Sequence, residues 1–174
     1  MAELITELES FRREKDDFFA HDRQSPLTTQ QKREFHGLNY FPENPDLRFE
    51  AKVEEFPNKE RVEMQTSTGD VQVYRRHSRF TFRVDGQEVA LSIYESDNGF
   101  FLPFVDSLAG KETYPAGRYL EPEPLSGGRF LIDFNLAYNP YCAYNEHWSC
   151  PLTPFENRLK VPIRAGEKIF DTQH

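Results

Sequence analysis

A period-two alternation of apolar and polar residues most strongly constrains the fold of this chain. The alternation covers residues 47–53 and 62–67, and it returns at 80–84 and 89–93 on either side of Asp85-Gly86. Because successive side chains of a β-strand point to opposite faces, each run predicts a strand with one buried face. The Asp-Gly dipeptide supplies the positive φ angles of a type I′ turn, so the last two runs predict a β-hairpin.

The first 37 residues have a helical spacing instead. Apolar side chains recur every three to four positions among charged residues, which predicts a helix over residues 2–20. These apolar positions include Leu4, Leu8, Phe11 and Phe18. Thr28 and Gln31 then have the spacing of a capping box, and Gly37 is placed to end the segment that they begin. A second helix of about two turns is therefore predicted there.

Further apolar runs extend the β pattern through the rest of the chain. They lie at 100–105, 117–120, 130–134 and 159–163. The predicted fold is mainly β: an antiparallel β-barrel or a sandwich-like meander, with one or two N-terminal α-helices. A chain of this length buries roughly 70% of its unfolded surface, and no internal boundary is visible, so residues 1–174 are expected to form one domain. Within it, 1–37 form the helical segment and 46–174 form the β domain, with a long motif loop at 135–158.

The chain is acidic, with 21 basic and 29 acidic side chains, a formal charge of −8 and a pI near 5.2. It lacks a basic stripe that would attract a phosphate backbone or an anionic membrane, so neither nucleic acid nor a membrane is an expected partner. No apolar run approaches the roughly 20 residues of a membrane span, and residues 1–4 lack the features of an export signal. A cytoplasmic location is therefore expected. The 16 Phe and 8 Tyr predict an aromatic core.

Cys142 and Cys150 allow three interpretations. With His147 they give the spacing C-x4-H-x2-C, which offers three ligands to zinc, although strong zinc motifs use more closely spaced pairs. Alternatively, Cys142 is a catalytic nucleophile whose thiolate is stabilised by His147, His77 or a helix terminus. In the third interpretation both are buried thiols, or in exported proteins a pair that closes the loop, and they pack the long loop against the barrel. No dinucleotide or phosphate-binding glycine motif is present, so no cofactor is expected.

A polar set in the second half of the chain predicts a binding site for a small polar or anionic molecule. Arg118 has the planar fork that grips a carboxylate or phosphate, or else it pairs internally with Asp133 or Glu156. Asp133 and Asn135 share one strand face, and inside a barrel they would need partners or a ligand. Nearby tyrosines supply apolar walls with hydroxyl tips. The predicted binding residues are Tyr114, Arg118, Asp133, Asn135, Tyr138, Asn139 and Tyr144.

Two other functions stay open at this point. A hydrolase-like enzyme would use Cys142 as a nucleophile, or Asp133 and Glu156 as an acid–base pair. A structural or interaction domain would have a packed interior and no pocket. Glu156-Asn157 after Pro154 also suits a loop-capping role through bonds from its side chains to backbone groups. The sequence leaves the choice among these functions, the ligand and the oligomeric state open.

Several motifs resemble the domain of unknown function 1684 family. The most specific stretch runs from Asp133 to Pro151 and contains Tyr138-Asn139-Pro140-Tyr141-Cys142-Ala143-Tyr144. Further matching motifs are Gly117-Arg118-Tyr119-Leu120, Asp133-Phe134-Asn135, Glu156-Asn157 and Ala165-Gly166-Glu167-Lys168. The resemblance covers nearly the whole chain and implies no established activity. It implies relatives in bacteria and archaea, some of them with export signals. Leu108 departs from the family pattern, in which a threonine is expected.

Overall fold

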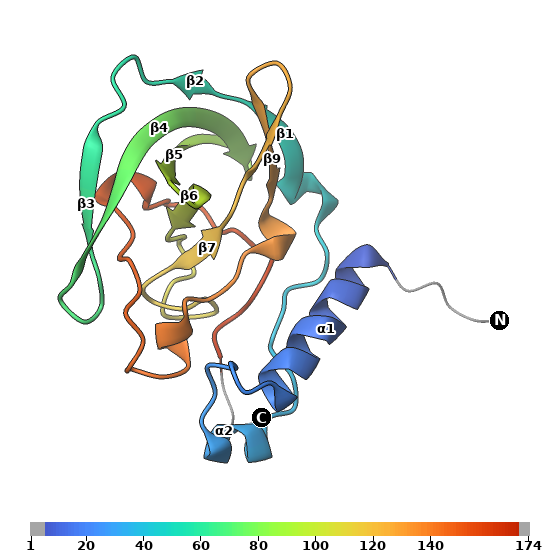
Figure 1. Ribbon diagram of the computed structural model, residues 1–174. Coiled ribbons are helices and arrows are strands. Elements are labelled where there is room, and N and C mark those ends of the chain that lie inside the picture. The colour runs from blue at the N-terminus through green and yellow to red at the C-terminus, as the bar shows by residue number, and fades with distance from the viewer. Residues whose placement is uncertain (1–5, 171–174) are drawn as a thin grey trace.

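Two antiparallel sheets form the body of the protein (Figure 1). The structure is a computed structural model, and it describes residues 6–170. The smaller sheet consists of β1 (Arg48–Lys52), β9 (Arg129–Asp133) and β8 (Glu123–Leu125), in that spatial order. The larger sheet consists of β2 (Glu54–Glu55), β4 (Val71–Val84), β5 (Gln87–Ser96), β6 (Gly99–Phe104) and β7 (Arg118–Leu120), in that order, and β3 (Arg61–Gln65) pairs with the same β4.

The two sheets do not close into a barrel, so the structure has the sandwich-like form of the two that were predicted. One hydrophobic core joins them, with Ile132 from the smaller sheet and Ile93 from the larger one both fully buried. Phe134, directly after β9, packs edge-on against Phe104, with ring centres 5.2 Å apart, and lies 5.4 Å from Phe82. The core is therefore aromatic, as the composition predicted.

The strongest sequence signal is confirmed as the hairpin of β4 and β5. Asp85 and Gly86 form its two-residue turn, with φ angles of 51° and 79°. Positive φ at both positions is the signature of a type I′ turn, whose twist matches that of the flanking strands. The alternating runs at 47–53 and 62–67 likewise appear as β1 and β3.

Both predicted helices are present. They are α1 (Glu7–His21) and α2 (Thr29–Glu34). The hydroxyl of Thr6 caps α1 by accepting a hydrogen bond from the N–H of Glu9 at 3.0 Å, and Thr28 forms the predicted capping box with Gln31 at the start of α2. Positions 2–5 of the first predicted helix lie outside the described residues. Neither of these helices is long and apolar enough to cross a membrane, and the same is true of every helix within 6–170.

The predicted strand at 159–163 is wrong, because this segment is irregular. Next to it, Arg158 forms an isolated bridge with Val105, and the N–H of Leu159 donates to the carbonyl of Val105 at 2.7 Å, but no ladder follows. Pro162 has no N–H to contribute, and the carbonyl of the next residue accepts a hydrogen bond from the Arg118 side chain. This segment is therefore bonded partly by scattered backbone hydrogen bonds, such as that from the N–H of Ser107 to the carbonyl of Val161 at 3.0 Å, and partly by side chains.

Residues 135–158 contain no β-strand longer than a single bridge. Short 3-10 turns shape this loop: η2 (Phe134–Leu136), η3 (Tyr141–Ala143) and η4 (Phe155–Asn157). The loop packs against α1, where Phe19 meets Tyr144 edge-on with ring centres 5.0 Å apart. The helix α1 therefore packs directly against the loop 135–158.

Candidate functional site

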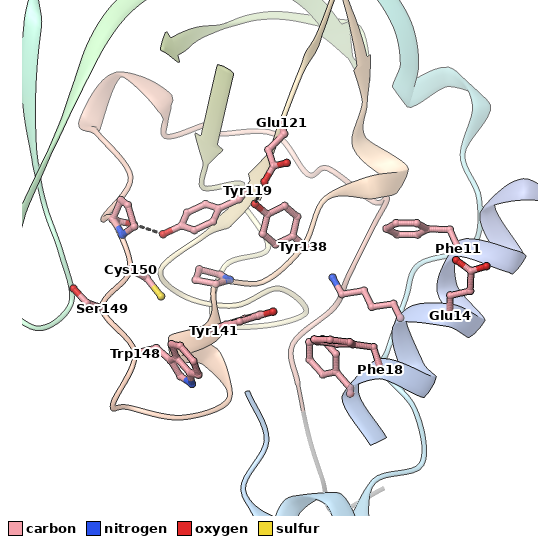
Figure 2. Close-up of a pocket in the computed structure, with 14 residues that line it drawn as sticks. Phe11, Glu14, Phe18, Tyr119, Glu121, Tyr138, Tyr141, Trp148, Ser149 and Cys150 are labelled. Atoms are coloured by element: carbon pink, nitrogen blue, oxygen red, sulfur yellow. Dashed lines mark hydrogen bonds between the residues drawn. The ribbon is translucent and has the colours of Figure 1, made fainter. Parts of the chain in front are cut away.

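An aromatic pocket of about 640 Å³ lies between α1 and the loop residues 138–151 (Figure 2). Its rings come from three segments that are far apart in the sequence. They are Phe11, Phe18 and Phe19 of α1, Tyr119 of β7, and Tyr138, Tyr141 and Trp148 of the loop. Pockets that hold small ligands have volumes of roughly 300–1,000 Å³ and mostly apolar walls. The aromatic pocket has both properties.

Three charged side chains, Glu14, Lys15 and Glu121, also line the aromatic pocket. The Tyr138 hydroxyl donates a hydrogen bond to Glu121 Oε1 at 2.6 Å. The ammonium group of Lys15 lies 5.0 Å from the centre of the Tyr138 ring and forms an ion pair with the buried carboxylate of Glu167. The charge of Lys15 is therefore neutralised within the fold, and one ring of the pocket already faces a cation.

Glu167 is the centre of a buried hydrogen-bond network behind the pocket. Its carboxylate accepts hydrogen bonds from the Tyr144 hydroxyl at 2.7 Å and from the backbone N–H of Asn139 at 3.2 Å. Burial and the nearby carboxylate both raise the pKa of Tyr144, so its hydroxyl stays protonated and donates. Asn139 and Tyr144 are two of the predicted binding residues. In the structure they join the loop to the C-terminal segment.

Cys142 and Cys150 are free thiols beside the aromatic pocket, and we call them the cysteine pair. The N–H of Cys142 donates to Cys150 Sγ at 3.3 Å, and the Tyr114 hydroxyl lies 3.6 Å from Cys142 Sγ. A hydrogen bond from the Cys150 thiol outweighs partial burial and, with the hydroxyls of Tyr114 and Ser67, lowers the pKa of Cys142 to about 6. The interaction with Cys142, together with burial, raises the pKa of Cys150. Cys150 also lines the pocket.

Comparison with known proteins identifies the family of this chain. Residues 33–168 match a family model described as "Protein of unknown function (DUF1684)". The chain belongs to the DUF1684 family. This match confirms the resemblance that the sequence motifs indicated.

A solved structure with the same fold as this DUF1684 chain comes from an archaeon. It is the solution NMR structure of an uncharacterized protein of Haloarcula marismortui, which is 38% identical in sequence. The match covers 96% of this chain and 94% of that chain, with a TM-score of 0.72. A comparison with curated proteins gives no match.

Arg118 of this DUF1684 member is buried inside the fold, and its exposed fraction is 1%. Its guanidinium donates to three backbone carbonyls within residues 163–167 and lies 3.5 Å from the carboxylate of Asp106. Burial lowers the pKa of Arg118 to about 10, which still leaves it charged at neutral pH. The predicted pairing of Arg118 with Asp133 or Glu156 is wrong, because Asp106 is the carboxylate beside it. Arg118 does not line the aromatic pocket.

Asp133 and Asn135 bond to each other and to the segment before β1. The Asn135 carboxamide donates to Asp133 Oδ1 at 2.9 Å and exchanges two hydrogen bonds with the backbone of Asn44, at 2.8 and 3.0 Å. Arg48 lies 3.6 Å from the Asp133 carboxylate. With no barrel interior for them to face, both residues border a neighbouring depression that shares Phe11 with the aromatic pocket, and neither lines that pocket itself. The structure therefore does not bring the predicted binding residues together at one site.

Glu156 is held by Arg76 and Tyr94. Arg76 donates to its carboxylate at 2.9 and 2.7 Å, and the Tyr94 hydroxyl donates to it as well. Burial favours the protonated form, but these hydrogen bonds outweigh it and lower the pKa of Glu156. Asp133 has different partners, so the structure does not assemble these two carboxylates into the predicted acid–base pair.

The zinc arrangement of Cys142, His147 and Cys150, one of the three interpretations that the sequence left open, is not formed in the structure. Among residues 6–170, no three His, Cys, Asp or Glu side chains are grouped as a metal site requires. His147 is exposed, and His77 bonds to the Ser78 hydroxyl at 2.9 Å. Thiol and hydroxyl donors, rather than an imidazole, stabilise the Cys142 thiolate.

Sequence reasoning missed the α1 wall of the pocket and the charged residues Glu121 and Glu167. Lys15 and Glu167 are 152 positions apart, so no local spacing relates them. Among the predicted binding residues, Tyr138 does line the aromatic pocket, and Tyr114 does contact Cys142. The density of aromatic residues in the motif loop was the one signal that pointed toward this part of the DUF1684 fold.

Proposed function

We propose that the protein binds a small molecule in the aromatic pocket, and that this ligand has a flat apolar body with a cationic or hydrogen-bond-donating end. One observation carries the proposal: rings from three segments surround a space of ligand size whose wall also holds the carboxylates of Glu14 and Glu121. The sequence predicts a small polar or anionic ligand; the small polar character is kept here, and the anionic character is replaced by a cationic or donating end. The proposed binding site is the aromatic pocket and not the region around Arg118 that the sequence predicted.

The walls of the aromatic pocket favour a flat ligand. Tyr119 and Tyr138 meet edge to face with ring centres 5.9 Å apart, and Tyr141 meets Trp148 at 5.1 Å. Each favourable pair of rings contributes about 0.5–1.5 kcal/mol beyond the burial of apolar area. The binding free energy of a ligand ring among these side chains would therefore include both ring pairing and the burial of apolar area.

The charges in the pocket favour a positive over a negative end. Lys15 is paired with Glu167, whereas neither Glu14 nor Glu121 forms an ion pair within the described part of the chain. Ring faces attract cations, and Lys15 above Tyr138 is an internal example. An anionic ligand would meet two carboxylates and no available cation.

Trp148 provides the readout for a test, because it is the single tryptophan of the chain and lines the pocket. Fluorescence titrations with benzyltrimethylammonium, benzyl alcohol and benzoate compare a cation, a neutral group and an anion on the same ring. We expect saturable binding that is strongest for benzyltrimethylammonium. The variant E121Q should weaken this binding about three- to tenfold, because it removes the charge and keeps the shape.

The matched control is E88Q, which removes an exposed carboxylate on the β4–β5 hairpin, away from the aromatic pocket. It should leave the affinity for benzyltrimethylammonium unchanged. Binding of benzoate as tight as that of the ammonium probe would contradict the proposed charge preference. If none of the three probes gave a saturable change, the structural or interaction domain would be the better interpretation.

A further inference from the structure

The cysteine pair has chemistry that ligand binding does not use. The two cysteines meet across the short loop 143–149, where the N–H of Cys142 donates to Cys150 Sγ at 3.3 Å. A reversible disulfide requires two cysteines whose Cβ atoms can approach to about 4 Å without a large backbone movement. Because Cys150 Sγ already lies 3.3 Å from the backbone nitrogen of Cys142, the two side chains are close enough for such an approach.

The two thiols are not equivalent. Cys142 is half-buried and has the Tyr114 hydroxyl 3.6 Å from its sulfur, whereas Cys150 is 7% exposed and its sulfur accepts the N–H of Cys142. The thiolate is the form that attacks a disulfide, and hydrogen-bond donors stabilise it. Cys142 is therefore the more exposed residue of the two and has the hydroxyl that stabilises a thiolate, with Cys150 beside it.

We propose that the cysteine pair is a thiol–disulfide exchange site that reacts with small aliphatic disulfides. The Cys142 thiolate attacks one sulfur of the disulfide, so that a mixed disulfide forms at Cys142 and the other half leaves as a thiolate. Cys150 then loses its proton to solvent, and its sulfur attacks that of Cys142 and expels the second thiolate. The pair is oxidised by two electrons to an internal disulfide, and the small disulfide is reduced to two thiols.

The internal disulfide would join both ends of the loop 143–149, which contains Trp148, and so would restrict its movement. Cys150 and Trp148 both line the aromatic pocket, and Tyr141, next to Cys142, packs against Trp148. Figure 2 shows the sulfur of Cys150 pointing toward the space between Tyr119 and Trp148. Oxidation therefore alters one wall of the pocket, and the fluorescence of Trp148 reports it without any ligand. The inference stands on the cysteine pair and does not depend on the proposed binding function.

The test uses the reduced chain and oxidised glutathione at pH 7, with the mass of the protein followed over time. The wild-type protein should pass through an adduct with one glutathione, mapped to Cys142, to a product lighter by two hydrogen atoms. C150S should stop at the adduct, and C142S should not react while folded. Equal reaction rates of C142S and C150S would overturn the assigned roles, and wild-type protein that reacted only in urea would overturn the site.

The variant Y114F distinguishes an activated thiol from a merely buried pair. Without the hydroxyl that contacts Cys142, adduct formation at pH 5, where the thiolate is the minor form, should slow about three- to tenfold, with little change in the urea midpoint. The matched control Y74F removes a hydroxyl that bonds to Gln72, outside the cysteine pair. Equal adduct rates in Y114F and Y74F would overturn the activation of Cys142 by Tyr114.

Discussion

The guanidinium of Arg118 lies 3.5 Å from the carboxylate of Asp106, and each of these side chains is 1% exposed. The same carboxylate accepts hydrogen bonds from the Thr113 hydroxyl at 2.7 Å and from the N–H of Ile163 at 2.8 Å. Arg118 on β7 and Asp106 just after β6 thus hold the irregular segment 163–167 against the larger sheet. The buried charge pair thus adds side-chain hydrogen bonds to the backbone ones that this segment forms with Phe41 and Ala137.

The first prediction concerns R118K. Lysine keeps the positive charge but lacks the planar fork that reaches three carbonyls, so a buried carbonyl loses its donor, and the free energy of unfolding should fall by about 1–3 kcal/mol in urea titrations. R129K is the matched control, because Arg129 forms an exposed ion pair with Glu50 at 2.9 Å, and it should change stability by less than about 0.5 kcal/mol. Similar unfolding midpoints for the two variants would contradict the structural role of Arg118.

The second prediction concerns Asn157, which is fully buried. Its Nδ2 donates to the carbonyls of Ser92 and Pro103 at 2.9 and 2.8 Å, and its Oδ1 accepts the N–H of Ser92 at 2.9 Å. N157D places a carboxylate oxygen against two carbonyl oxygens, so it should cost about 2–5 kcal/mol of unfolding free energy at pH 7. N58D, at an exposed position, should have little effect, and a small loss in N157D would contradict the bridging role.

The parts of the fold that the sequence predicted correctly depend on local signals. The hairpin turn at Asp85-Gly86 and the capping box of Thr28 and Gln31 each need only a few adjacent residues. Pro162 lies in a run that reads as a strand, yet its segment is bonded by Arg118, which is about 45 positions earlier. A sequence pattern relates neighbours along the chain, so it does not show a hydrogen bond from a side chain that lies this far away in the sequence.

The candidate site was predicted less well than the fold, for a related reason. Tyr138 and the cysteines belong to a dense motif loop, and that density correctly drew attention to it. The opposite wall comes from α1, where Lys15 and its neighbours look like an ordinary amphipathic helix. Arg118 was expected to bind an anion because its fork suits one, but the same fork suits backbone carbonyls equally well.

The third prediction is the pH dependence of alkylation at Cys142. Its pKa of about 6 lies below the ordinary value of about 8.5, so the thiolate already predominates at pH 7. The rate of reaction with iodoacetamide should rise between pH 5 and 7 and then level off. In C150A, which lacks the largest cause of the shift, the midpoint should move up toward the ordinary value.

The titratable groups around Cys142 support this attribution. Cys150 and Tyr114 contact it directly, and Tyr119 lies close enough to interact with both thiols, but the pKa of each of these three groups is raised. They therefore stay neutral over the tested range and do not add a second inflection. A midpoint near 8.5 in the wild-type protein would contradict the activation of Cys142.

The fourth prediction is the loss of stability in acid through Glu156. Its pKa is lower in the folded than in the unfolded protein, because hydrogen bonds from Arg76 and Tyr94 outweigh burial. Its contribution to stability is therefore complete above the unfolded pKa of about 4.3 and is lost as the pH falls through the folded value. E156Q should be less stable than wild type at pH 7, and the difference should shrink in urea titrations below pH 4. E88Q, which removes an exposed carboxylate, should match wild type at both pH values, and a constant deficit of E156Q at every pH would show that shape rather than charge matters there.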